Sequence, residues 1–248
     1  MPQPSRQLVL ICGGRGTRLR ADAAAPLPKS MTEVAGEPIV QRLIRQFQAL
    51  HSAGPGPVVI VAQGDEHTPK LVRDRLGSRA VIVEQAKPDG VANAILLAAP
   101  HILDQAFIFL GDVVLEGSFS EPLPSGSAVC LWDEAPGEAT RENFGVVTEN
   151  GAVADLVEKP AEPRGLKCGI GVYALQRACI EKFVEAPVNA VKGEREITEA
   201  LRYVMRRGFP LGTFHFSGAY ININRLADRS HAEEVLKTLS GRERQASG

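Results

Sequence analysis

A short apolar segment near the N-terminus runs directly into a glycine-rich turn, and this combination limits the possible folds more than any other part of the sequence. Residues 7–12 (QLVLIC) are apolar and include branched side chains, which predicts a buried strand. Gly13, Gly14 and Gly16 follow it, and glycines let backbone N–H groups approach phosphate oxygens because no Cβ atom intervenes. This pattern favours an α/β fold that holds a phosphorylated ligand at the carboxyl end of its first strand.

Strand-like and helix-like segments alternate through the first half of the chain. Apolar runs predict buried strands, and segments with apolar residues every three or four positions predict helices. The predicted strands are 58–62, 80–84 and 106–110, and the predicted helices are 38–50, 69–76 and 91–103. We therefore expect a doubly wound, mostly parallel, Rossmann-like sheet that binds ligands at the carboxyl ends of its strands.

The second half changes character, because short strands separated by polar turns replace the regular alternation. The predicted strands are 128–132, 144–148, 153–158 and 169–175, followed by helices at 197–207 and 231–239. Antiparallel additions to the sheet are the expected result. No linker composition divides the chain, so we predict one domain over residues 1–240, with halves at about 1–112 and 113–240, and a disordered tail at 241–248.

Charge and cysteine content argue against several classes of protein. Lys and Arg total 28 against 29 for Asp and Glu, so the overall balance lacks the basic excess expected of a nucleic-acid or membrane surface. The four cysteines are scattered without metal-binding spacing, which favours reduced cytosolic residues. The N-terminus is too polar for a signal peptide and no apolar run matches a membrane span, so we expect a cytoplasmic protein.

Two cations follow the glycine-rich turn at positions suited to a triphosphate. A tight structural turn and a dinucleotide fingerprint are the alternatives, but the GxGxxG pattern is absent and no Walker lysine follows. Arg18 adds a fixed fork of cationic donors suited to phosphate, and Lys29 is a second cation on the same loop, so we predict a triphosphate site here.

The same segment begins a series of motifs that resembles the sugar-phosphate nucleotidyltransferase family over roughly residues 7–240. The motifs follow the family's order: GGRGTRL at 13–19, LPK at 27–29, EQAKPDG at 84–90, FLGD at 109–112, FGV at 144–146, VEKP at 157–160, GIGVY at 169–173, GEREIT at 193–198 and YININ at 220–224. The segment at 84–90 is closest to the glucose-1-phosphate thymidylyltransferase and uridylyltransferase branches. The resemblance implies a Mg²⁺-dependent enzyme that joins a nucleoside triphosphate to a sugar 1-phosphate and releases pyrophosphate.

The resemblance also assigns roles to individual residues, with the nucleotide in the first half of the chain and the sugar in the second. It implies a nucleotide site at Cys12, Gly13, Gly14, Gly16, Thr17, Gln85, Gly90 and Val91, beside the catalytic Arg18 and Lys29. It implies a sugar site at Gly145, Glu158, Lys159, Ile170, Gly171, Tyr173 and Glu196. In the family, the glutamate at the Glu158 position binds a sugar hydroxyl and the lysine at the Lys159 position binds the sugar phosphate.

The predicted metal ligands are Asp112 and Asn222. Asp112 follows an apolar strand at the expected ligand edge, where a carboxylate is destabilising unless a cation or a helix terminus compensates it. An N-cap role is the alternative for Asp112. Asn222 stands where the family commonly has an aspartate, and an amide oxygen can bind Mg²⁺ without adding charge. Asn224 is the alternative second ligand if the register shifts by two residues.

The two substrates remain open at this point. The Gln85 amide can pair with the O4 and N3–H edge of uracil or thymine, which favours a pyrimidine nucleotide. Ile170 stands where relatives often have Thr or Asn, and the loss of a hydroxyl-binding group favours an unusual sugar. The alternatives are a guanylyl- or cytidylyltransferase for an unusual sugar, cyclitol or polyol phosphate, and a non-catalytic ligand-binding regulatory relative. We expect a stand-alone protein, compatible with a homo-oligomer, without nucleic-acid or membrane partners.

Overall fold

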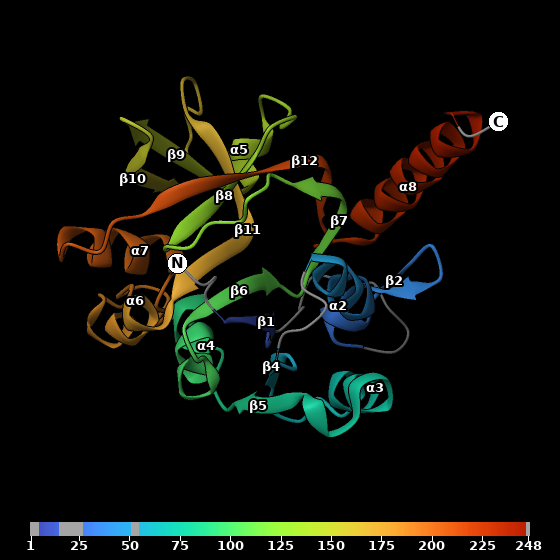
Figure 1. Ribbon diagram of the computed structural model, residues 1–248, viewed down its shortest axis with the longest axis horizontal. Coiled ribbons are helices and arrows are strands. Elements are labelled where there is room, and N and C mark those ends of the chain that lie inside the picture. Colours follow the sequence, from blue (N-terminus) through green and yellow to red (C-terminus); the bar gives the residue numbers. More distant parts are fainter. Residues whose placement is uncertain (1–4, 15–26, 51–54, 247–248) are drawn as a thin grey trace.

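A large sheet runs through the molecule, with helices on both of its faces (Figure 1). The computed structural model describes residues 5–14, 27–50 and 55–246. Within them, the sheet is formed by β1 (Arg6–Cys12), β4 (Val58–Ala62), β5 (Val81–Gln85), β6 (Gln105–Leu110), β7 (Val113–Phe119), β8 (Ala128–Trp132), β9 (Phe144–Glu149), β10 (Ala152–Glu158), β11 (Lys167–Gln176) and β12 (Gly212–Asn222). A separate ribbon pairs β2 (Glu33–Val34) with β3 (Glu37–Pro38).

The helices of the described residues vary widely in length. They are α2 (Ile39–Leu50), α3 (His67–Leu76), α4 (Val91–Ala98), α5 (Ala139–Glu142), α6 (Arg177–Glu181), α7 (Ile197–Arg206) and α8 (Leu226–Ala246), with 3₁₀ turns at Lys29–Met31, Gly77–Arg79, Ala99–His101 and Lys182–Glu185. Among these helices, none combines the length and the apolar character needed to cross a bilayer.

The order and direction of the strands confirm the predicted α/β class. β5, β4, β1 and β6 are parallel neighbours and form the doubly wound first half of the sheet. β11 pairs with β6 in the antiparallel direction and is followed by β8, β12 and β7, while β9 and β10 extend from β11. Thus the second half adds antiparallel strands to the parallel ones, as the short strands of the sequence predict.

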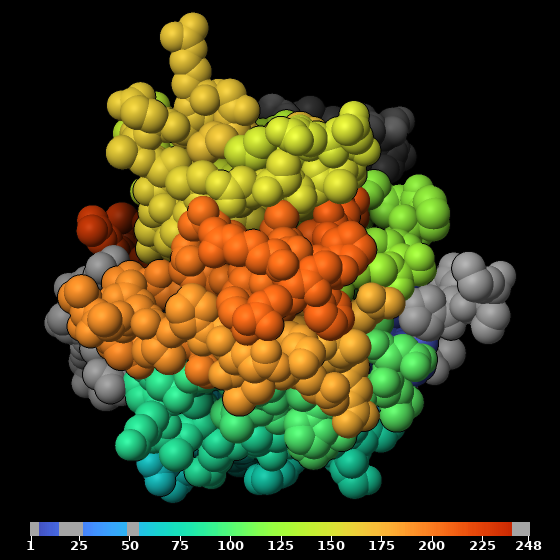
Figure 2. Space-filling view, turned by 90° about the vertical axis from the view of Figure 1, so that its left-hand side faces the viewer, coloured from blue at the N-terminus to red at the C-terminus, as the bar shows by residue number. Residues whose placement is uncertain are grey.

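Alternating side chains of β1 explain why helices cover both faces. Leu8 and Leu10 pack in one core cluster with residues of α2, α3 and α8, whereas Val9 and Ile11 pack in another with residues of α4, α6 and α7. A strand that is apolar at every position is therefore buried on both sides. Figure 2 shows the second of these faces, where segments of the second half of the chain, in yellow and orange, lie above green and teal segments of the first half.

Most predicted elements are present, and the differences have local causes. Seven strands are predicted after residue 12. Six of them begin and end within one residue of the observed strands. The seventh, predicted at 169–175, corresponds to β11, which is longer at both ends. The helix predicted at 91–103 ends at Ala98 and continues as a 3₁₀ turn, because Pro100 has no N–H group to continue the helical ladder. The helix predicted at 231–239 is longer, spanning Leu226–Ala246, so it includes most of the segment predicted as a tail.

Candidate active site

Several chain segments that carry predicted functional residues meet at one edge of the sheet. β1 and β6 run parallel and end there at Cys12 and Leu110. β11 runs antiparallel to β6, so its first residues lie at the same edge. The end of β12 joins them, because the Ile223 N–H donates to the Asp112 carbonyl oxygen over 2.8 Å. This is the edge where ligands bind in open α/β sheets.

Lys29 lies at the centre of a small polar cluster at this edge. Its Nζ atom is 3.2 Å from Asp112 Oδ2 and 2.7 Å from Asn224 Oδ1. The Lys29 side chain is 16% exposed and that of Asp112 is 31% exposed, so the pair is shielded but still reached by solvent. Two oxygen atoms from residues far apart in the sequence therefore converge on one cationic atom.

Asp228 holds Asn224 in place, and sequence analysis did not select it. Its Oδ2 atom accepts hydrogen bonds from the backbone N–H groups of Asn224, over 2.7 Å, and Arg225, over 2.8 Å. Both donors precede the first turn of α8, where backbone N–H groups lack helical partners. An acidic residue four positions after Asn224 is the signal that the sequence offered for this contact.

Asn222, the other predicted metal ligand, is engaged elsewhere. Its Oδ1 atom accepts a hydrogen bond from the Tyr220 hydroxyl over 2.8 Å, and its Nδ2 atom donates to Asn143 Oδ1 over 3.0 Å. The Tyr220 hydroxyl oxygen in turn accepts from the Gly171 N–H over 3.2 Å. Burial raises the pKa of Tyr220 well above its ordinary value, so the hydroxyl stays protonated and can donate. Asn222 thus connects β12 to the predicted sugar side.

The predicted phosphate turn is described only in part. Cys12 ends β1 and is buried, and burial raises the pKa of its thiol to about 12, which makes it a neutral packing residue. A Cβ atom on Gly13 would lie 2.6 Å from Gln85 Oε1, so a side chain there would displace the end of the Gln85 side chain. A Cβ atom on Gly14 would meet no described atom within 4 Å. Gly16, Thr17 and Arg18 lie outside the described residues.

The predicted base-recognition segment is bonded to the sugar-side loop that precedes α7. Gln85 Nε2 donates to Asp89 Oδ1 over 2.9 Å. The Arg195 N–H donates to the Asp89 carbonyl oxygen over 2.8 Å, and the Ala92 N–H donates to the Arg195 carbonyl oxygen over 3.2 Å. Gly90 lies in the sequence between the two residues bonded to Arg195, and Val91, which follows it, begins α4. Residues predicted to contact the base are therefore fixed by the other half of the chain.

We expect Gly90→Ala to destabilise the protein. Gly90 has a φ angle of 112°, and a Cβ atom there would lie 2.3 Å from the Arg195 carbonyl oxygen. The strain and the collision should together lower the free energy of unfolding by about 2 kcal/mol or more. Gly64→Ala is the matched control, because Gly64 has a φ angle of 80° with nothing near its Cβ position. Equal losses in the two variants, measured by urea denaturation, would contradict the packing argument.

The two carboxylates predicted to bind the sugar lie where β10 ends and α7 begins. The Thr198 hydroxyl donates to Glu158 Oε2 over 3.1 Å, and partial burial of the Glu158 carboxyl raises its pKa, although the residue as a whole keeps exposed surface. Glu196 directly precedes α7 and pairs with Lys192. Lys159 has a φ angle of 42°, and its N–H donates to the Asn143 carbonyl oxygen over 3.0 Å. Lys159 thus departs from the extended conformation that usually precedes a proline, and the backbone turns sharply where β10 ends.

The remaining sugar-side residues are packed in the interior. Gly145 and Gly171 leave room for neighbouring leucines, since Cβ atoms on them would lie 2.5 Å from Leu166 and 2.8 Å from Leu110. Ile170 is fully buried in the core and Tyr173 is 1% exposed. The sequence argument for an unusual sugar therefore loses its support, because the Ile170 side chain packs in the core and presents no surface to a ligand.

Sequence comparison matches most of the candidate site to one family. The profile of the family described as "Nucleotidyl transferase" matches residues 7–222, which contain nearly all of the segments discussed above. The chain belongs to the nucleotidyl transferase family. The resemblance inferred from the motif order is thereby confirmed.

Characterised members of the nucleotidyl transferase family resemble the chain at low identity. It is 28% identical to the UTP–glucose-1-phosphate uridylyltransferase AglF of Haloferax volcanii, over 93% of this chain and 96% of that protein. It is also 28% identical to a glucose-1-phosphate thymidylyltransferase of Streptomyces antibioticus, over 94% of this chain and 67% of that protein. The bifunctional protein GlmU of Methanocaldococcus jannaschii is 28% identical over 92% of this chain, which spans 53% of GlmU.

Solved structures of the family share the fold. The inositol-1-phosphate CTP transferase of T. maritima superposes with a TM-score of 0.76 at 17% identity, covering 95% of this chain and 97% of that chain. A UDP-glucose pyrophosphorylase bound to UDP-glucose superposes with a TM-score of 0.73 at 20% identity, covering 94% and 98%. At these identities the likeness concerns the fold and leaves the substrates to be argued from the site.

Proposed function

We propose that the protein transfers a nucleotidyl group from a nucleoside triphosphate to a sugar 1-phosphate. In this reaction an oxygen of the sugar phosphate forms a bond to the α-phosphorus, and the bond between that phosphorus and the α,β-bridging oxygen breaks. The electron pair of the broken bond leaves with pyrophosphate. No protein base is required, because the attacking phosphate oxygen is already anionic.

The cluster of Lys29, Asp112 and Asn224 is the observation that carries this proposal. It places a lysine ammonium and a carboxylate at the edge where β1 ends at Cys12 and Gly13 follows, so the cation stands beside the predicted phosphate turn. Lys29 can bind an oxygen shared by the α-phosphate and the incoming phosphate and reduce the repulsion between the two anions. This contact becomes more favourable as charge accumulates in the transition state.

The donor atoms of the same cluster fit Mg²⁺. Asp112 Oδ2 and Asn224 Oδ1 converge on one cation, whereas the Asn222 oxygen accepts from Tyr220. One carboxylate and one amide oxygen suit Mg²⁺, which binds few protein atoms and completes its shell with phosphates and water. Among the described residues, no three His, Cys, Asp or Glu side chains gather as a metal site, so such a two-residue site is the arrangement to test. Bound Mg²⁺ would neutralise charge on the triphosphate.

The sugar side offers complementary chemistry. Glu158 carries a carboxyl group that can accept hydrogen bonds from sugar hydroxyls, and its partner Thr198 keeps it oriented. The adjacent ammonium of Lys159 is exposed and can meet the sugar phosphate. Because the Asn143 carbonyl oxygen fixes the Lys159 backbone while the Asn143 side chain contacts Asn222, this residue joins the two parts of the site.

We expect pyrimidine triphosphates that carry an N3–H group to be preferred. Asp89 accepts from Gln85 Nε2, which leaves Gln85 Oε1 as the acceptor, and uracil and thymine have the matching N3–H donor. Steady-state kcat/KM measured by pyrophosphate release should favour UTP and dTTP over CTP, GTP and ATP in the presence of glucose 1-phosphate and a panel of other sugar phosphates. A purine nucleotide favoured by more than about tenfold, or about 1.4 kcal/mol, would refute the base assignment. The absence of pyrophosphate release with every pair would refute the transferase.

A further inference from the structure

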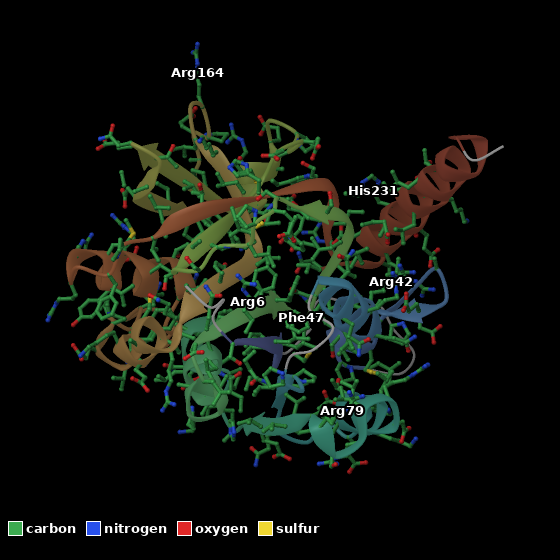
Figure 3. The ribbon with its side chains drawn as sticks, in the orientation of Figure 1. Arg6, Arg42, Phe47, Arg79, Arg164 and His231 are labelled. Atoms are coloured by element: carbon green, nitrogen blue, oxygen red, sulfur yellow. The ribbon has the colours of Figure 1, made fainter. Side chains whose placement is uncertain are left out.

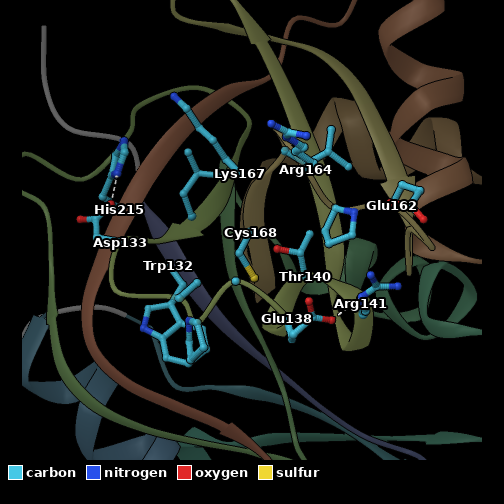
Figure 4. A pocket seen from close by; sticks show the side chains of 17 residues that line it. Trp132, Asp133, Glu138, Thr140, Arg141, Glu162, Arg164, Lys167, Cys168 and His215 are labelled. Carbon is cyan, nitrogen blue, oxygen red and sulfur yellow. Dashed lines mark hydrogen bonds and ion pairs between the residues drawn. The ribbon is translucent and has the colours of Figure 1, made fainter.

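A pocket of about 650 Å³ lies at the carboxyl end of β8 (Figure 4). It is lined by the end of β8, the segment 133–138, α5, the loop between β10 and β11, the first residues of β11, and His215 of β12. None of the described residues assigned above to the nucleotide, metal or sugar lines it. Its volume is that of a typical small-molecule site. The transferase reaction therefore leaves this pocket without a role.

The pocket opens on the face of β11 opposite to Gly171 and Tyr173. Cys168 lines the pocket, and side chains alternate along a strand, so Cys168 and Tyr173 point to opposite faces. The core confirms this, because the two residues belong to different hydrophobic clusters on the two sides of the sheet. Gly171 and Tyr173 therefore face away from the pocket, whereas Ile170 lies on the same side of the sheet as Cys168 but is fully buried.

Trp132 gives the pocket a rigid aromatic wall. It is the only tryptophan of the chain. Its Nε1 atom donates to the Gly218 carbonyl oxygen over 2.8 Å, and its ring packs on Tyr220 at 5.5 Å between centroids. These contacts hold the indole in one orientation, with its remaining surface available to a ring-shaped ligand. Leu166 and Cys168 add further apolar surface to the lining.

Two of the three acids in the lining already have partners. Asp133 accepts hydrogen bonds from His215 Nδ1 over 2.6 Å and from the Ser217 hydroxyl over 3.0 Å. Glu138 pairs with Arg141, one of the three cations in the lining. The Glu138–Arg141 pair therefore contributes no net charge, whereas Asp133 keeps its negative charge, because a hydroxyl does not compensate a carboxylate and His215 is charged only when protonated.

Two cations of the lining have no acidic partner in the part of the chain that the structure describes. Arg164 and Lys167 make no ion pair with any residue in the described ranges, although Asp133 and Glu162 are acids of the same lining. Lys167 is the first residue of β11 and belongs to the pocket lining. Arg164 projects away from the body of the molecule at the tip of the β10–β11 loop (Figure 3). An exposed arginine changes rotamer rapidly, so it can fold over an anion bound beside Lys167.

We propose that this pocket is a second ligand site, which binds a small phosphorylated compound carrying a ring. The ring stacks on Trp132, the phosphate binds Lys167, and Arg164 closes over the phosphate. Arg and Lys are the side chains that bind phosphate most strongly, and a neutral sugar would leave both cations without a partner. This inference is independent of the proposed transferase activity.

The intrinsic fluorescence of Trp132 tests the proposal directly, because no other tryptophan contributes to the signal. Titration of the full chain with phenyl phosphate should give a saturable change, with a Kd on the order of 1 mM or tighter. Phenol should bind about tenfold more weakly or worse, because it lacks the phosphate. Lys167→Ala should weaken phenyl phosphate by about tenfold, and Lys167→Arg should restore most of the affinity.

Two variants distinguish binding in this pocket from binding elsewhere on the chain. Lys237→Ala on α8 removes an exposed charge far along the chain and should leave the Kd unchanged. Lys29→Ala removes the cation of the transferase site and should also leave it unchanged. If Lys29→Ala abolishes the signal while Lys167→Ala does not, the probe occupies the nucleotide site and the proposal is wrong. Equal affinity for phenol, or no saturation, also overturns it. Pyrophosphate release plays no part in these measurements.

Discussion

Lys29→Ala should lower kcat for pyrophosphate release by about 100-fold or more, the usual cost of removing one oriented donor from a transition state. The Lys29 ammonium lies 3.2 Å from the Asp112 carboxylate, at the edge where the phosphate turn begins. Its loss removes the charge that we place between the two reacting phosphates. KM for the nucleotide should rise much less than kcat falls, because the contact strengthens mainly in the transition state.

The Lys29 experiment needs a control for folding and for net charge. Lys70→Ala removes an exposed lysine of α3 that pairs with Asp74 on the surface, and it should keep normal kcat. Lys29→Arg keeps the charge with a different geometry and should recover part of the activity. If Lys29→Ala is folded, as judged by its thermal transition, and retains kcat close to that of the unmodified chain, the catalytic role assigned to Lys29 is wrong.

The parallel strands and the glycine-rich turn could be read from the sequence because their signals are local. Apolar runs bounded by glycine or polar residues located β1, β4, β6 and β8 to within one residue. Motif order then identified the family, and the family profile confirms it. In such a fold the carboxyl ends of parallel strands share one edge, so sequence alone placed Asp112 beside the nucleotide turn.

Two strands at the far edge of the sheet were missed because glycines interrupt them. β7 and β12 pair so that Gly117 lies opposite Gly218. A Cβ atom on Gly117 would lie 2.1 Å from the Ser217 carbonyl oxygen, so this position requires glycine. Interior glycines weaken a strand pattern, and their cause here is a close approach of two backbones that only the folded structure displays.

The contacts that organise the candidate site also could not be predicted from the sequence. Asn143, Arg195 and Asp228 act through tertiary hydrogen bonds, to Asn222, to the segment at Gly90 and to the backbone of Asn224. Arg195 lies within the motif at 193–198, but the sequence assigned no role to any of the three, because only the folded chain shows their partners. The burial of Ile170 is the reverse case, in which a motif position drew attention although its side chain serves the core.

Asp112→Ala should be inactive at any Mg²⁺ concentration, with kcat lowered at least about 100-fold. The variant loses the only carboxylate among Asp112, Asn222 and Asn224, and neither amide can replace its charge. Higher Mg²⁺ concentrations should not restore activity, because the site would then consist of neutral donors beside the Lys29 cation. Full activity of the unmodified chain in EDTA would refute the metal assignment altogether.

The choice between Asn224 and Asn222 as the second ligand can be decided by Mg²⁺ titration. Asn224 Oδ1 and Asp112 Oδ2 both contact the Lys29 ammonium, whereas Asn222 Oδ1 accepts a hydrogen bond from the Tyr220 hydroxyl. Asn224→Asp should therefore lower the Mg²⁺ concentration for half-maximal activity by about tenfold, or about 1.4 kcal/mol, because it adds a charge to the ligand pair. Asn222→Asp should have a smaller effect. Asn150→Asp, an exposed substitution in the turn after β9, controls for added negative charge and should leave the titration unchanged. A larger shift for Asn222→Asp than for Asn224→Asp would assign the metal to Asn222 and would require the Tyr220 hydroxyl to release it when substrate binds.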